Sequence, residues 1–186
     1  MSIAIHTQIT PNPNAWKFII SQDVIVAGKA SFDKAEDAAN VPLAAALFAI
    51  DHVTQVHFFE NVITVTQNGE ASWRDMEDAV RQTIVANIDA HDTNIGGAQQ
   101  ETTPNRDDLP EDIRTIEEIL DRTIRPHLQN DGGDLDVVKY EEEKDLLMVR
   151  YQGACGSCPS ATMGTLYAIQ GILQDEFNEN IEVIPV

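Results

Sequence analysis

The only cysteines in the chain, Cys155 and Cys158, are the strongest candidates for reactive or metal-binding side chains. They are separated by two residues in the segment GACGSCP (residues 153–159), after a strand-like run and before a helix-like one. A Cys-x-x-Cys loop can hold one metal ion or one edge of a metal cluster, and it can also close into a small disulfide. Pro159 suits the first position of a helix, so both sulfurs should lie near backbone N–H groups that stabilise thiolates and anionic centres.

The number of ligands limits what this pair can hold alone. A closed zinc site needs four ligands and iron–sulfur clusters usually take four cysteine thiolates, whereas one chain supplies two. The nearest histidine in sequence, His127, lies before the strands that precede the cysteines. Two chains could each contribute one pair across a twofold axis, which is the commonest symmetry of oligomers.

Two other interpretations of the pair stay open. A dithiol–disulfide oxidoreductase also uses a CxxC, but no Lys, Arg or His follows Arg150 to tune the thiols. The strands before the cysteines also indicate a hairpin, whereas a thioredoxin-like enzyme places its dithiol in a parallel βαβ unit. Zinc with other ligands, or two inert cysteines, would fit the spacing as well, because an isolated CxxC is only moderately specific.

The elements around the pair predict a small domain at residues 110–186 with the order α-β-β-α-β. Its first helix should begin near Pro110, and Pro126 should kink or end it. The segment DGGD (131–134) predicts a helix-to-strand turn with glycine at positive φ, not a calcium loop. The other expected elements are strands at 135–140 and 146–151, a helix after the cysteines and a last strand at 181–184.

Residues 1–91 predict a second unit of the same class. A rigid turn at TPNPN (10–14) should separate two strands, and Ser72 should cap a helix with buried residues at helical spacing. The other expected elements are strands at 3–5 and 15–20, a helix from Pro42, and a hairpin at 53–60 and 62–66. Residues 92–109 lose all periodicity. We therefore expect an α+β protein whose domains, 1–91 and 110–186, are joined by a flexible linker at 92–109.

Composition narrows the partners and the compartment. The 31 acidic and 12 basic residues give a net charge of −19, which repels nucleic acid and anionic membranes and favours basic protein partners. No apolar run approaches the roughly 18 residues that indicate a membrane span. Residues 1–16 contain no Lys or Arg, so we expect no presequence and a cytoplasmic protein, or the matured form of an organellar one.

Several segments together resemble a known family. IRPHLQNDGGD (124–134), followed by QGACGSCPS (152–160), resembles the C-terminal domain of NifU-like (Nfu-type) iron–sulfur scaffold proteins. TPNPNA (10–15) with Lys17-Phe18, and Phe58 with ITVT (63–66), resemble the N-terminal domain of that family. Both matches stand in the expected order and together cover most of the chain.

The resemblance implies a carrier of iron–sulfur clusters, not an enzyme. It implies that Cys155 and Cys158 of each of two subunits bind one 4Fe–4S cluster at a homodimer interface. It further implies upstream assembly proteins as sources of the cluster and apo iron–sulfur proteins as acceptors. The sequence departs from the family at Trp16, where an aliphatic residue is common, and at Met163-Gly164, where Ser or Thr is common.

Overall fold

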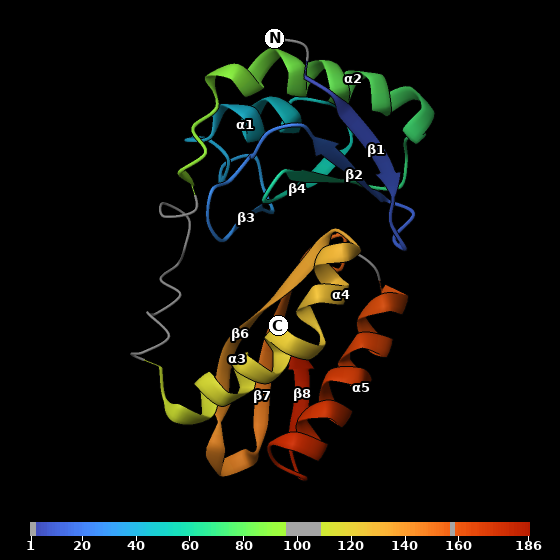
Figure 1. Ribbon diagram of the computed structural model, residues 1–186. Coiled ribbons are helices and arrows are strands. Elements are labelled where there is room, and N and C mark those ends of the chain that lie inside the picture. The colour runs from blue at the N-terminus through green and yellow to red at the C-terminus, as the bar shows by residue number, and fades with distance from the viewer. Residues whose placement is uncertain (1–2, 96–108, 157–158) are drawn as a thin grey trace. The chain divides into compact units, whose positions relative to one another are not determined.

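The computed structural model describes residues 3–95, 109–156 and 159–186, without the side chains of 159–162. The chain divides into two compact units, Met1–Gln100 and Glu101–Val186. Each unit has its own sheet and its own hydrophobic core (Figure 1). The predicted α+β class with two domains is therefore confirmed. Most of the predicted linker, residues 96–108, lies outside the described part of the chain.

The N-terminal unit is a five-stranded antiparallel sheet with its helices packed on one face (Figure 1). The strands lie in the order β1-β2-β5-β4-β3. Phe18 and Ile63 are neighbours on adjacent strands and are fully buried against the helices. The elements are β1 (Ile5–Ile9), β2 (Ala15–Ile20), β3 (Lys29–Phe32), α1 (Pro42–Phe48), β4 (Val53–Phe59), β5 (Val62–Gln67) and α2 (Trp73–Asn87), followed by a short 3-10 turn at Ile88–Ala90.

The structure confirms the predicted turn at residues 10–14 and the predicted helix that Ser72 caps, and side-chain contacts connect the two. The Ser72 hydroxyl accepts a hydrogen bond from the backbone N–H of Arg74, as an N-cap should. Trp73 donates its ring N–H to the carbonyl of Pro13 at 3.0 Å. Its ring also stacks on Trp16 at a centroid distance of 5.0 Å. The departure from the family at Trp16 therefore has a structural reason, since Trp73 supplies an aromatic partner.

Two features of this unit differ from expectation. The first strand runs from Ile5 to Ile9, whereas the sequence predicted residues 3–5, because pairing with β2 sets its extent. The edge strand β3 was not predicted at all. It has only four residues, too few for alternation to be seen, and it forms through antiparallel pairing with β4.

The C-terminal unit is a three-stranded sheet in the order β6-β7-β8, with helices packed into its core (Figure 1). β6 and β7 form the predicted antiparallel hairpin, while β8 pairs parallel with β7. The long helix between β7 and β8 permits this parallel return. The elements are α3 (Glu111–Thr123), α4 (Arg125–Asn130), β6 (Gly133–Glu141), β7 (Leu146–Gly153), α5 (Pro159–Glu176) and β8 (Glu182–Pro185), with a 3-10 turn at Glu142–Lys144 in the hairpin.

Pro126 and the DGGD turn mark element boundaries as predicted, but the structure has two helices here, α3 and α4, where the sequence predicted one. The first helix ends at Thr123, and Pro126 lies in the first turn of a new helix, where its missing N–H costs nothing. After α4 ends, Gly132 takes φ +81°, so the DGGD segment is the predicted helix-to-strand turn. Among the described residues, no helix has the length and apolar content needed to cross a membrane.

Candidate cysteine site

The structure places one of the two predicted ligands. Cys155 follows the end of β7 by two residues, is half-buried, and packs against the hydrophobic core of its unit. The other predicted ligand, Cys158, lies outside the described residues. α5 begins at Pro159, as the sequence predicted for a proline in a first helical turn.

The floor beneath Cys155 is the backbone of the DGGD turn. Gly133 pairs with Gly153 in the β6–β7 register, and the N–H of Ala154 donates to the carbonyl of Gly132 at 3.1 Å. A Cβ on Gly133 would lie 2.5 Å from the sulfur of Cys155 and 2.9 Å from its backbone nitrogen. Neither distance is possible, so the cysteine can occupy this place only above a glycine.

The loop itself turns tightly over this floor. Gly153 takes φ +61°, and the N–H of Gly156 donates to its carbonyl at 3.0 Å. The two glycines of DGGD therefore have separate roles: Gly132 makes the turn, and Gly133 makes room for the sulfur. Sequence reasoning recognised the first role and missed the second. The partner of Gly133 is 22 positions away in sequence, and only the register of the hairpin reveals it.

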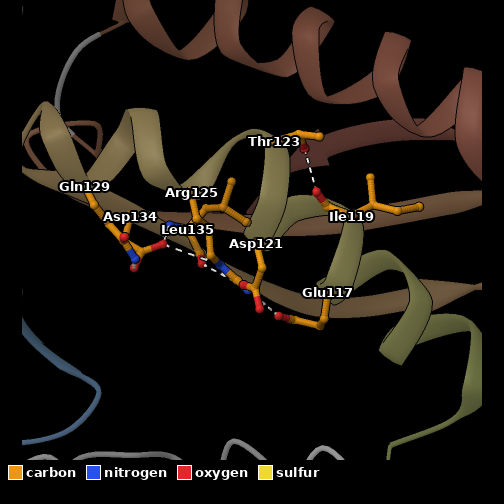
Figure 2. Close-up of polar contacts among 8 residues, drawn as sticks. All are labelled: Glu117, Ile119, Asp121, Thr123, Arg125, Gln129, Asp134 and Leu135. Atoms are coloured by element: carbon orange, nitrogen blue, oxygen red, sulfur yellow. Dashed lines mark hydrogen bonds and ion pairs between the residues drawn. The ribbon is translucent and has the colours of Figure 1, made fainter.

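A buried arginine fixes the start of β6. Arg125 is 8% exposed, and Figure 2 shows its guanidinium turned toward carboxylates from α3 and from the start of β6. It pairs with Glu117 at 2.6 Å, with Asp121 one helical turn back, and with Asp134 at 3.6 Å. Burial alone would lower the pKa of Arg125, but its bonds to Glu117 and Asp121 and the charge of Asp134 raise it above its ordinary value.

Asp134 connects this arginine to the floor under the cysteine. It is 2% exposed, it accepts the N–H of Leu135 at 2.7 Å, and Gln129 of α4 donates to it at 3.2 Å. Because Asp134 directly follows Gly133, these bonds hold the backbone on which Cys155 lies. Sequence reasoning assigned Arg125 no part in the site. Asp121 and Arg125 are four residues apart across the junction of α3 and α4, and that spacing was the available signal for a pair.

One buried hydroxyl in the core against which Cys155 packs has no hydrogen-bond partner in the described part of the chain. Tyr151 of β7 is 9% exposed, and its hydroxyl oxygen has no hydrogen-bond partner among the described residues. Burial raises the pKa of this tyrosine, and the charge of Cys155 raises it further.

The described residues contribute a single sulfur to this site. Across residues 3–95, 109–156 and 159–186, no group of three or more His, Cys, Asp or Glu side chains is placed to hold a metal ion. A thiol suits a soft metal or an iron–sulfur cluster. The ligand count from the sequence, two thiols per chain, stays a prediction because Cys158 lies outside the described residues.

Family models match both units of the chain. The model described as "Scaffold protein Nfu/NifU N terminal" matches residues 5–91, and the model described as "NifU-like domain" matches residues 116–184. Both cysteines fall within the second match.

Similar proteins match most of the chain. It is 31% identical over 183 residues to "NifU-like protein 5, mitochondrial" of Arabidopsis thaliana, covering 94% of the chain and 65% of that protein. It is 35% identical over 174 residues to the human "NFU1 iron-sulfur cluster scaffold homolog, mitochondrial", covering 91% of the chain and 66% of that protein. The chain thus spans slightly less than two thirds of these relatives. The solution structure of a NifU-like protein from Saccharomyces cerevisiae aligns with 47% of the chain and 80% of its own length, at 17% identity and a TM-score of 0.44.

Replacing Gly133 with alanine should destabilise the C-terminal unit by about 1–3 kcal/mol, because the new methyl group collides with Cys155. Both tryptophans lie in the other unit, so tryptophan fluorescence during urea unfolding follows that unit alone, and the remaining change in far-ultraviolet circular dichroism reports the C-terminal unit. Gly164→Ala is the matched control. No atom of the described residues lies within 4 Å of a Cβ at that position of α5, so alanine should stabilise the helix by up to about 1 kcal/mol. Equal stability of Gly133→Ala and wild type would contradict the proposed fit of glycine and sulfur.

Replacing Arg125 with methionine should cost about 3–5 kcal/mol, because Glu117 and Asp134 stay buried and lose the guanidinium. The raised pKa of Arg125 keeps it charged into the alkaline range, so the loss should be the same at about pH 7 and about pH 10. The control is Arg122→Met, which removes an exposed pair with Glu176 and should cost no more than about 1 kcal/mol. Equal losses from both variants, measured by urea unfolding, would argue against the buried cluster.

Proposed function

Because the chain belongs to the NifU-like (Nfu) family, we propose that it binds an iron–sulfur cluster and delivers it to apo-proteins. The observation that carries the proposal is the placement of Cys155, which lies on a glycine floor within the NifU-like domain. The names of the human relative and of the N-terminal family model contain the word scaffold, which agrees with this role. The cluster is the cargo of the protein, and no chemical conversion is needed.

Cys155 and Cys158 are the proposed ligands. Their spacing places two thiolates on one short loop, which suits two corners of a cluster. Two copies of the loop then complete a 4Fe–4S cluster with four cysteine ligands, and the site lies on the twofold axis of a homodimer.

Such a shared site explains how a carrier can release its cargo. A cluster divided between two subunits is held only as firmly as the two subunits hold each other. Loosening the dimer exposes the cluster to the thiolates of an acceptor, whereas four ligands from one chain would enclose it. Apo iron–sulfur proteins are therefore the proposed acceptors, and upstream assembly proteins the proposed source.

The acidic surface bears on partners and compartment. A net charge of −19 favours basic surfaces on the proteins that meet this chain and disfavours nucleic acid. The Arabidopsis and human relatives are named as mitochondrial proteins. The cytoplasmic compartment expected from the sequence stays a prediction.

Anaerobic reconstitution with iron and sulfide tests the proposed cargo. We expect a brown dimer with about four iron and four sulfide per pair of chains. Cys155→Ser and Cys158→Ser should each abolish the cluster, while far-ultraviolet circular dichroism of the apo-protein stays unchanged. A colourless monomer that reduces disulfides would instead indicate a dithiol oxidoreductase. Zinc retained by the dimer in place of iron would indicate a structural metal site.

Covalent crosslinking of the loaded dimer tests the release step. If opening of the dimer exposes the cargo, a crosslinked dimer should transfer its cluster to an apo-ferredoxin more slowly than the unlinked dimer. The measurement is the absorbance or circular dichroism of the acceptor cluster over time. Transfer at the unlinked rate would show that the dimer need not open.

A further inference from the structure

Tyr151 is the one tyrosine of the described residues whose hydroxyl is both buried and without a hydrogen-bond partner. Its side chain lies on the inward face of β7, in the same buried series as Leu147 and Val149. The other two tyrosines differ: the hydroxyl of Tyr140 accepts a hydrogen bond from Asn178, and Tyr167 is 68% exposed. A buried hydroxyl normally finds a partner, so Tyr151 is an exception that needs a reason.

A candidate partner for this hydroxyl is the sulfur of Cys155. Tyr151 and Cys155 pack in the same core at the end of β7. The charge of Cys155 acts on the phenol, and both burial and that charge favour the protonated hydroxyl. The phenol therefore keeps its O–H at neutral pH and can only donate toward an anion. A neutral thiol accepts hydrogen bonds weakly, whereas a thiolate or sulfide accepts them well.

We propose that the Tyr151 hydroxyl donates a hydrogen bond to an anionic sulfur at the Cys155 loop when the cargo is bound. This inference rests on the proposed function. The acceptor is either the thiolate of Cys155 or an inorganic sulfide of the cluster. Tyr151 is then a positioning residue that is left unsatisfied in the empty protein and becomes satisfied on loading. Hydrogen bonds to cluster sulfurs are one of the means by which proteins set cluster reduction potentials.

The proposal predicts that Tyr151→Phe raises the stability of the apo-protein but weakens its hold on the cargo. Tyr151→Phe removes an unpartnered buried hydroxyl from the apo-protein, so the melting temperature of the C-terminal unit should rise by about 4 °C or more. In the loaded protein the same change removes a hydrogen bond to sulfur. The cluster should then be lost to a chelator about 10-fold faster, and its midpoint potential should become more negative. A residue with a purely structural role would move both properties in the same direction.

The experiment compares Tyr151→Phe with two matched controls, Tyr140→Phe and Tyr167→Phe. Each removes one hydroxyl from the same unit. Tyr140→Phe should lower apo stability slightly because it removes a partnered hydroxyl, and Tyr167→Phe should change nothing. Neither control should change the midpoint potential of the cluster. The apo-proteins are compared by thermal unfolding, and the reconstituted dimers by potentiometry and by the rate of bleaching with a chelator.

Resonance Raman spectra of the loaded dimers separate the two acceptors. Exchange of the inorganic sulfide for ³⁴S shifts bridging modes and leaves iron–cysteine stretching modes nearly unchanged. If Cys155 is the acceptor, Tyr151→Phe should shift the unlabelled iron–cysteine modes; if sulfide is the acceptor, it should shift the labelled ones. Either shift supports the proposal.

Failure of the proposed function and failure of this inference give different results. If the wild-type chain takes up no cluster, the proposed function fails, whatever Tyr151 does to the stability of the apo-protein. If the wild type loads normally and Tyr151→Phe has the same potential, bleaching rate and Raman modes, the cargo is carried but the hydroxyl does not contact its sulfur. An apo-protein destabilised by Tyr151→Phe would likewise overturn the inference, because the hydroxyl would then have a partner in the empty state.

Discussion

The contact between a glycine backbone and a cysteine sulfur is the constraint on which the C-terminal unit depends. Cys155 can take its place only because Gly133 has no Cβ, since a methyl group there would lie 2.5 Å from the sulfur. The contact joins residues 22 positions apart and requires the register that pairs Gly133 with Gly153. A slip of one residue would place the Asp134 side chain under the sulfur. The hairpin register is therefore part of the site, not only part of the fold.

The buried Arg125 cluster explains why that register is held. Burying the charge of Arg125 away from water costs free energy. Its ion pairs with three carboxylates from α3 and β6 offset that cost. An apolar cluster would tolerate small displacements, because hydrophobic contact is not directional. Ion pairs and hydrogen bonds are directional, so the cluster fixes where Asp134, and hence Gly133, must lie. Positioning of the loop, more than net stability, is the contribution that an ionic cluster can make here.

The sequence predicted most of the fold for identifiable reasons. Ser72, Pro126 and Gly132 each act through local backbone chemistry, and each marks an element boundary where it was expected. The edge strand β3 could not be predicted, because its four residues become a strand only through β4. For the same reason β1 begins and ends where β2 requires. Element boundaries set by local backbone chemistry could be predicted from the sequence, whereas those set by strand pairing could not.

The candidate site, like the fold, could be predicted only where local sequence determines it. Cysteine spacing and ligand number indicated half a metal or cluster site, and Cys155 lies between a strand and a helix, as the flanking sequence predicted. The roles of Gly133, Arg125 and Tyr151 could not be read from the sequence, because each depends on a partner brought close by folding. Gly133 lies in a motif that a turn already explains, so the sequence offered no reason to assign it a second role.

The net charge of the chain also bears on how long the proposed dimer should last. Each chain carries a net charge of −19, so two copies repel each other over about a Debye length, roughly 8 Å at physiological salt. In the proposed dimer, a cluster bound by four thiolates would add further negative charge at the axis, and its iron–sulfur bonds would join the two loops. Once an acceptor replaces one pair of ligands, those bonds are broken on one side and the like charge of the subunits favours separation. The acidic composition would then act in delivery itself, because it keeps the carrier from remaining a dimer after its cargo has gone.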